Sequence, residues 1–196
     1  MLQYIVILGA VVNLLGSAAY IRDTLIGKTQ PNRITFLMWG IAPCIGAAAA
    51  FSDGVRWSVL PVLTSGILPF LILLASFFNK KAVWELHWYD YVCGAFSLLA
   101  LVLWKETQQP TIAIVFAIIG DGFAGLPTFK KSWTHPETET PLAYIATAFA
   151  AATSFFAMRT WRFEEYAFPA YLVLSGTILF LIISYRKDCR SLIMKK

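Results

Sequence analysis

A single carboxylate, Asp121, lies within the long uncharged run AIVFAIIGDGFAGLPTF at positions 113–129. An ionisable side chain in the middle of an apolar segment is costly to bury, so it is typical of a cavity, a buried partner or a proton pathway. We therefore expect Asp121 to line a cavity and to be the candidate for proton coupling. The alternative is a structural role, in which a neutral Asp121 bonds to Asn13 or to a backbone carbonyl and holds two helices together.

The sequence shows no catalytic machinery beside this carboxylate. It has no phosphate-binding glycine loop, no nucleophile elbow and no paired-carboxylate motif. His87 and His135 have no second ligand at metal-binding spacing, and the three cysteines form no recognisable framework. We predict that the protein is not an enzyme and that it binds no cofactor and no metal.

The composition predicts an integral membrane protein. Of the 196 residues 58% are hydrophobic and 14% are charged, with a mean hydropathy of +0.65, whereas soluble domains carry about 25% charged residues. Apolar runs close to the ~20 residues that span a bilayer recur along the whole chain. They predict an all-α protein with seven transmembrane helices, at about 2–21, 34–51, 58–78, 90–104, 110–129, 141–158 and 167–185.

Lys and Arg are unevenly divided between the predicted connections. Twelve lie on the side of the 1–2, 3–4 and 5–6 connections and the C-terminus, and four lie on the opposite side. The positive-inside rule places the basic side in the cytoplasm and the N-terminus outside a plasma or inner membrane. We therefore attribute the net charge of +5 to topology, with membrane lipid and not nucleic acid as the expected partner.

The chain contains an internal repeat. Residues 12–32 align with 120–140 at an offset of 108, and residues 63–77 align with 173–185 at an offset of 110. This predicts a 3+1+3 arrangement, because an odd number of helices in each repeat needs one extra span to keep the repeats parallel. The expected units are a first three-helix repeat at 1–78, a linker helix region at 79–108, a second three-helix repeat at 109–186 and a cytoplasmic tail at 187–196.

Two segments carry a resemblance to a known family. AYIRDTLIGKTQPNRITFLMW (19–39) and AGLPTFKKSWTHPETETPLAY (124–144) resemble the PQ-loop signature of the family that includes SWEET sugar transporters, cystinosin-like exporters and the KDEL receptor. The resemblance implies two parallel three-helix bundles and transport by alternating access. It also implies that prolines on the cavity helices act as hinges, here Pro43 and Pro127. Thr128 stands where the family has glutamine, and this departure from the motif leaves the identity of the solute undetermined.

The repeat assigns partners to the residues expected in the cavity. Asn13 is the counterpart of Asp121, and Ser17 shares the helix face of Asn13. On the second helix of each repeat, Trp39 is matched by Thr147, and Gly46 is matched by Ser154. An aromatic wall opposite small polar groups suits a ring-shaped or amphipathic solute. The alternative for Trp39 is a place in the interfacial aromatic belt.

These observations favour a small-molecule transporter for a sugar, an amino-acid-like or a vitamin-like solute. A two-repeat chain encloses its own pathway, so a monomer is sufficient. The alternative is a receptor with the architecture of the KDEL receptor and a site near the loops, at residues such as Arg22 and Lys130. Lys130 and Lys131 are expected to set the orientation of the chain in the membrane. An ion pair between Asp23 and a basic residue is a candidate gate.

Overall fold

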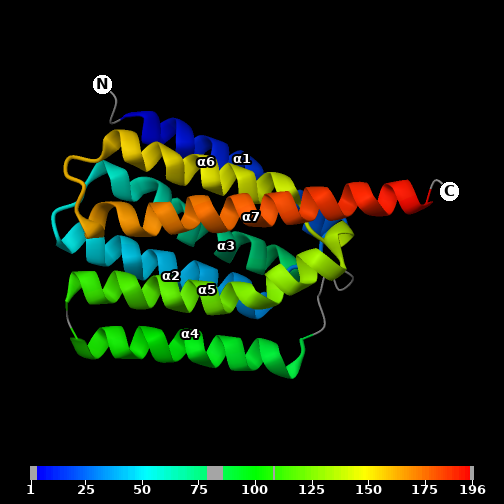
Figure 1. The fold of residues 1–196 in the computed structure, drawn as a ribbon, viewed down its shortest axis with the longest axis horizontal. Helices are drawn as coiled ribbons and strands as arrows, with labels where there is room; N and C mark the ends of the chain where they lie inside the picture. The colour runs from blue at the N-terminus through cyan, green and yellow to red at the C-terminus, as the bar shows by residue number, and fades with distance from the viewer. Residues whose placement is uncertain (1–3, 79–85, 108, 195–196) are drawn as a thin grey trace.

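In a computed structural model the chain is an all-helical bundle, described over residues 4–78, 86–107 and 109–194 (Figure 1). Two short 3₁₀ turns, η2 (Trp57–Val59) and η3 (Pro136–Thr138), precede α3 and α6. Over these residues the α-helices are α1 (Ile5–Leu25), α2 (Arg33–Ser52), α3 (Leu60–Phe78), α4 (Trp88–Thr107), α5 (Pro110–Thr134), α6 (Pro141–Ala157) and α7 (Phe163–Met194). Four of the twelve basic residues assigned to the cytoplasmic side lie outside the described residues: Lys80, Lys81, Lys195 and Lys196.

Several helices have the length and composition of membrane spans. Five stretches qualify: Ile5–Leu25, Arg33–Ser52, Trp57–Phe78, Pro110–Thr134 and Phe163–Arg190, and α6 is a shorter apolar helix. A 20-residue helix is about 30 Å long, the thickness of the hydrocarbon core. Large apolar side chains such as Leu15, Leu74 and Leu181 are more than half exposed on the outer surface. The chain is therefore an all-α, multi-pass membrane protein.

Helix ends follow local backbone chemistry. Gly27 and Gly54 have φ values of 77° and 88° and lie just beyond α1 and α2, where a left-handed residue ends a helix at no steric cost. Asn32 caps the start of α2 by accepting a hydrogen bond from the Thr35 N–H at 3.1 Å. Pro110 and Pro141 open α5 and α6, at positions where the missing N–H costs nothing.

Three helices continue at least four residues beyond the predicted end of their apolar runs. α1 continues to Leu25, α5 to Thr134 and α7 to Met194, whereas the apolar runs end at 21, 129 and 185. The predicted tail at 187–196 is therefore helical as far as Met194. Charged residues end a hydrophobic run, but they do not interrupt the i to i−4 backbone hydrogen bonds that define a helix.

Six helices pack in a closed ring in the order α1, α3, α2, α5, α7, α6, and we call α1–α3 one helix set and α5–α7 the other. α3 packs against α1 and α2, and α7 packs against α5 and α6. The sets meet along two seams, one where α1 packs on α6 and one where α2 packs on α5. α4 lies on the outside of α5 (Figure 1). The connections α1–α2 and α5–α6 and the C-terminus lie at one end of the bundle, which we call the basic end, and η2 and the α6–α7 connection lie at the opposite end (Figure 1).

The seam between α1 and α6 is close-packed through glycine. A Cβ on Gly16 would lie 2.4 Å from the Cβ of Ala146, and one on Gly9 would lie 2.3 Å from Oγ1 of Thr153. Small residues let membrane helices approach closely and gain van der Waals contact. This seam therefore has no room for a larger side chain.

Replacing Gly16 by Ala is expected to lower the free energy of unfolding by about 1–3 kcal/mol, the usual cost of overpacking. Gly122→Ala is the matched control, because its new Cβ would meet only the Tyr171 hydroxyl, at 3.8 Å. The control is expected to be neutral or to gain about 0.5–1 kcal/mol, as a helical Gly→Ala change allows. Thermal unfolding of the detergent-solubilised variants measures both, and equal stability of the two variants would contradict the close seam.

α5 changes direction in its C-terminal part and leans towards the other helices at the basic end (Figure 1). Pro127 lies inside this part of the helix and is buried. It has no N–H to donate to the carbonyl four residues earlier, and its ring crowds that carbonyl, which bends a helix. Pro43 lies inside α2, the helix that packs on α5. One seam is therefore built on glycine and the other carries both predicted hinge prolines.

Candidate functional site: a polar pocket inside the helix bundle

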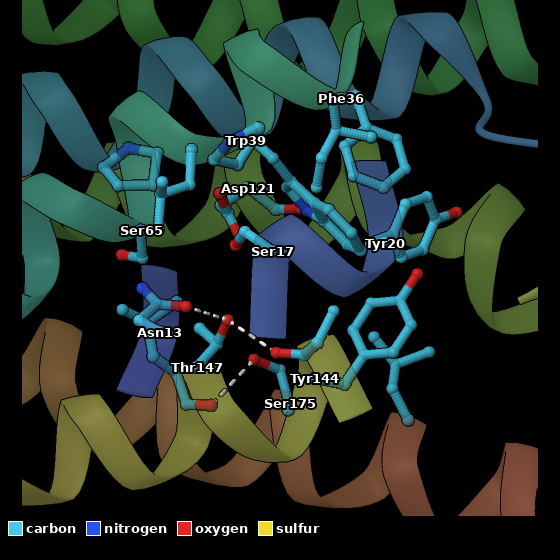
Figure 2. Close-up of a pocket in the computed structure, with 18 residues that line it drawn as sticks. Asn13, Ser17, Tyr20, Phe36, Trp39, Ser65, Asp121, Tyr144, Thr147 and Ser175 are labelled. Atoms are coloured by element: carbon cyan, nitrogen blue, oxygen red, sulfur yellow. Dashed lines mark hydrogen bonds between the residues drawn. The ribbon is translucent and has the colours of Figure 1, made fainter. Parts of the chain in front are cut away.

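A pocket of about 70 Å³ lies inside the bundle, between the two helix sets. Its volume is several times the roughly 10–15 Å³ that one water needs on this measure. Its lining comes from α1, α2, α3, α5, α6 and α7 and includes one acidic residue, Asp121, and no Lys, Arg or His among the described lining residues. The 18 lining residues are drawn in Figure 2. Polar side chains gather on one side of the pocket, and the rings of Tyr20, Phe36 and Tyr144 on the other.

Most of the predicted cavity residues meet at this pocket. Asn13, Ser17, Trp39, Asp121 and Thr147 all line it, together with the predicted hinge residue Pro43. Ser154 is fully buried but is not among the lining residues, because it lies about two turns further along α6 than Thr147. Pro127 is also buried away from the pocket lining.

Two hydrogen bonds cross between the helix sets at equivalent positions. The Thr147 hydroxyl of α6 donates to Oδ1 of Asn13 in α1 at 2.9 Å. The Trp39 indole N–H of α2 donates to the backbone carbonyl of Asp121 in α5 at 3.1 Å. Each residue of one bond is separated by 108 positions from its counterpart in the other. Trp39 therefore lies at the contact between α2 and α5, packed on Gly125, where a Cβ would lie 3.2 Å from its ring.

The Asp121 carboxylate is only partly satisfied. Its Oδ2 accepts a hydrogen bond of 2.8 Å from the Tyr171 hydroxyl of α7, while its Oδ1 has no hydrogen-bond partner among the described residues. Nδ2 of Asn13 is likewise buried without a partner in the described part of the chain. The two side chains are 3% and 1% exposed. A buried polar atom without a partner costs about 1–3 kcal/mol, so both atoms are ready to bind a solute or water.

An aromatic cluster forms the wall nearest the basic end. The Tyr20 ring packs on Phe36 at 5.2 Å between centroids, and Phe36 packs edge-on to Trp39 at 5.6 Å. Tyr144 meets the rings of Tyr20 and Trp39 at 6.3 and 6.2 Å. These separations lie in the range where aromatic pairs attract each other beyond simple area burial.

A buried charge cluster lies behind this wall at the basic end. Glu139, in the connection before α6, accepts hydrogen bonds of 2.7 Å from the hydroxyls of Tyr20 and Tyr144. Its carboxylate also forms an ion pair of 2.5 Å with Lys131, and the two side chains are 0% and 1% exposed. Lys187 of α7 donates to the Glu139 backbone carbonyl at 2.7 Å. We call Tyr20, Lys131, Glu139 and Tyr144 the basic-end cluster.

A second network closes the opposite end. The buried carboxylate of Glu165 accepts hydrogen bonds from the backbone N–H of Thr160 at 2.7 Å and from the Ser58 hydroxyl at 3.4 Å. Arg162 forms a partly exposed ion pair of 2.9 Å with Asp53, which links the α6–α7 connection to the end of α2. The pocket therefore lies between two polar networks that each join the helix sets.

The basic-end cluster was not expected from the sequence. Lys131 was assigned to membrane orientation, yet it is 1% exposed, because Glu139 neutralises it and the Gln30 carbonyl accepts one of its N–H groups. The proposed ion pair of Asp23 lies nearby, with Lys28 at 3.1 Å and Thr140 donating to the same carboxylate oxygen at 2.7 Å. The repeat offsets would have indicated three missed pocket pairs: Phe36 with Tyr144, Ser65 with Ser175, and Pro69 with Leu179.

Comparison of the chain with protein-family models, with curated proteins and with solved structures found no match. Across the described residues, no group of three His, Cys, Asp or Glu side chains is arranged to hold a metal ion. The interpretation of the site therefore depends on the geometry of the pocket and of the two networks around it.

Proposed function

We propose that the protein is a small-molecule transporter that exposes the central pocket alternately to the two sides of the membrane. In this proposal α1–α3 and α5–α7 are parallel three-helix repeats, α4 is the linker, and all seven helices span the bilayer. The observation that carries the proposal is the pocket lining. Ten of the 18 lining residues fall into pairs at the repeat offsets: Asn13 and Asp121, Phe36 and Tyr144, Trp39 and Thr147, Ser65 and Ser175, and Pro69 and Leu179.

The packing inside the two sets supports the same proposal. Gly66 of α3 and Gly176 of α7 are 110 positions apart. A Cβ on Gly66 would lie 3.1 Å from the carbonyl of Gly40 in α2, and one on Gly176 would lie 3.2 Å from the Cβ of Ala148 in α6. Gly40 and Ala148 are themselves 108 positions apart. Repeats related by an axis along the membrane normal place their site at the interface near the midplane.

The PQ-like segments lie at the basic end of the bundle (Figure 1), and we propose that this end faces the cytoplasm. The two PQ-like segments, 19–39 and 124–144, contain all four residues of the basic-end cluster. We assign the basic end to the cytoplasm of a plasma or inner membrane, because most Lys and Arg residues lie there. The basic-end cluster is then the cytoplasmic gate, and the Glu165 network is the gate on the outer side.

Alternating access requires one gate to open while the other holds. In the proposed cycle the bent helices α2 and α5 move at Pro43 and Pro127, and the glycine seam between α1 and α6 stays packed. Separation of Tyr20 from Glu139 would open the pocket towards the basic end. Separation of Ser58 from Glu165 would open it towards the other side. In the proton-coupled form of the cycle, Asp121 carries the proton, so the flux that remains in Asp121→Asn is expected not to respond to a proton gradient.

A flux assay with a mixture of solutes of different classes tests the proposal, and a variant that fills the pocket shows whether the flux passes through it. Proteoliposomes are loaded with an equimolar mixture of amino acids, monosaccharides, small amines and water-soluble vitamins, and the solutes that leave are identified by mass spectrometry. The wild-type protein is expected to release at least one solute faster than empty liposomes. Ser65→Trp is expected to reduce that flux at least tenfold, because Ser65 lines the pocket and is 6% exposed.

Leu74→Trp is the matched control, since Leu74 lies on the same helix and is 56% exposed on the outer surface. It is expected to keep the wild-type flux. Saturable binding of a solute in the pocket without any release from liposomes would contradict transport and support a receptor.

A further inference from the structure

The described residues that line the pocket include an acidic side chain and no basic one. Asp121 is the only charged residue among the described residues that line it. Its Oδ1 is buried and has no hydrogen-bond partner in the described part of the chain, and its other oxygen accepts a hydrogen bond from the uncharged Tyr171 hydroxyl. A buried charge is costly unless it is paired and hydrogen-bonded. An anionic solute would therefore meet no positive group among the described lining residues, whereas a cation could pair with the Asp121 carboxylate.

The aromatic side of the pocket also favours a cationic solute. Trp39, Phe36, Tyr20 and Tyr144 line the pocket together, and Trp39 bonds to the same residue that supplies the carboxylate. The faces of aromatic rings attract cations, most strongly at Trp, and the attraction grows when the cation is removed from water. A carboxylate beside a Trp ring is a combination that suits an ammonium group.

The unpartnered Nδ2 of Asn13 indicates a second group that the solute should carry. Nδ2 of Asn13 is a donor, and its Oδ1 is already occupied by the Thr147 hydroxyl. It needs an acceptor, such as a hydroxyl or carbonyl oxygen. The space of about 70 Å³ in the pocket limits the solute to a few heavy atoms.

We propose that the pocket selects a small organic ammonium that also carries a hydroxyl or carbonyl oxygen. This inference rests on the proposed function and specifies its solute class. The ammonium donates to Oδ1 of Asp121 and lies against Trp39, while the solute oxygen accepts from Nδ2 of Asn13. Ser65 and Ser175, whose hydroxyls donate to carbonyls of their own helices, lie on the polar side of the same pocket (Figure 2).

Three probes of similar size and different charge test the assignment. Ethanolammonium is the cation, glycolate the anion and ethylene glycol the neutral analogue, each titrated into detergent-purified wild-type protein by calorimetry. Ethanolammonium is expected to bind at least tenfold more tightly than either of the others. Asp121→Asn is expected to weaken its binding at least tenfold. Glu106→Gln, which alters an exposed carboxylate at the end of α4, away from the pocket, is expected to leave it unchanged.

A graded change of the Trp ring provides a second line of evidence that does not depend on how the Asp121 variant folds. Trp39→Phe keeps a ring and is expected to weaken ethanolammonium binding less than Trp39→Leu, with little change for ethylene glycol. Equal binding of all three probes, tighter binding of glycolate, or binding of none of them would overturn the ammonium assignment. Release of only neutral or anionic solutes from the proteoliposomes would also overturn it and leave transport standing. Asp121-dependent ethanolammonium binding without any flux would support the assignment and contradict transport.

Discussion

Replacing Lys131 by Met is expected to lower the free energy of unfolding by about 3–5 kcal/mol, because it leaves the buried Glu139 carboxylate without its cation. The two side chains are 1% and 0% exposed and 2.5 Å apart, so water cannot take the place of the lost partner. Glu139→Gln is expected to be costly for the same reason, since it leaves a buried ammonium. The double variant Lys131→Met/Glu139→Leu removes both charges and is expected to recover part of the loss.

An exposed ion pair in the same connection is the control. Arg190 and Glu137 are also 2.5 Å apart, but their side chains are 40% and 52% exposed. Glu137→Gln is expected to change stability by less than about 1 kcal/mol, as is usual for a surface pair. Chemical or thermal unfolding in detergent measures all four variants. A Lys131→Met variant as stable as Glu137→Gln would show that the basic-end cluster does not hold the helix sets together.

Moving the carboxylate from one helix set to the other is expected to restore function that its removal abolishes. Asp121→Asn is expected to reduce flux of the transported solute at least tenfold. Asn13→Asp combined with Asp121→Asn is expected to recover most of the flux, because the proposed repeat makes the two positions equivalent and both line the pocket. The hydrogen bonds survive the exchange, since Thr147 can donate to an aspartate at 13 and Tyr171 can donate to an asparagine at 121.

The same proteoliposome assay, with the solute that the wild-type protein releases, measures this exchange. Asn13→Asp alone is the control, because it puts two carboxylates in one pocket and is expected to reduce flux. If the double variant is as inactive as Asp121→Asn, the two helix sets do not present equivalent positions to the solute.

The helices could be predicted from hydropathy, and many of the pocket residues from the sequence offset of the proposed repeat. Asp121 is conspicuous in an uncharged run, and the offset of 108 leads from it to Asn13. Both line the pocket, together with Trp39 and Thr147. Ser154 shares the predicted face of α6 but lies too far along the helix, because helical spacing gives a face and does not give the depth of a cavity.

The basic-end cluster could not be predicted, because its burial depends on contacts between distant segments. Glu139 lies in the polar run THPETETP, which is typical of a solvated loop. It is buried because Tyr20 of α1, Tyr144 of α6 and Lys187 of α7 converge on it. Tyr171 was also missed: its counterpart at an offset of 110 is Pro61, so the repeat gives no indication that it bonds to Asp121.

Accessibility of a pocket thiol from each side of the membrane tests the central claim most directly. The native cysteines Cys44, Cys93 and Cys189 are first replaced by Ala, and Ser65→Cys introduces one thiol into the pocket lining. Ser52→Cys, at an exposed position at the end of α2, reports the sidedness of the vesicles. A membrane-impermeant methanethiosulfonate is then added from one side or the other. Alternating access predicts that the thiol at 65 is labelled from both sides and the thiol at 52 from one side only, whereas labelling at 65 from a single side, or from neither, would contradict it.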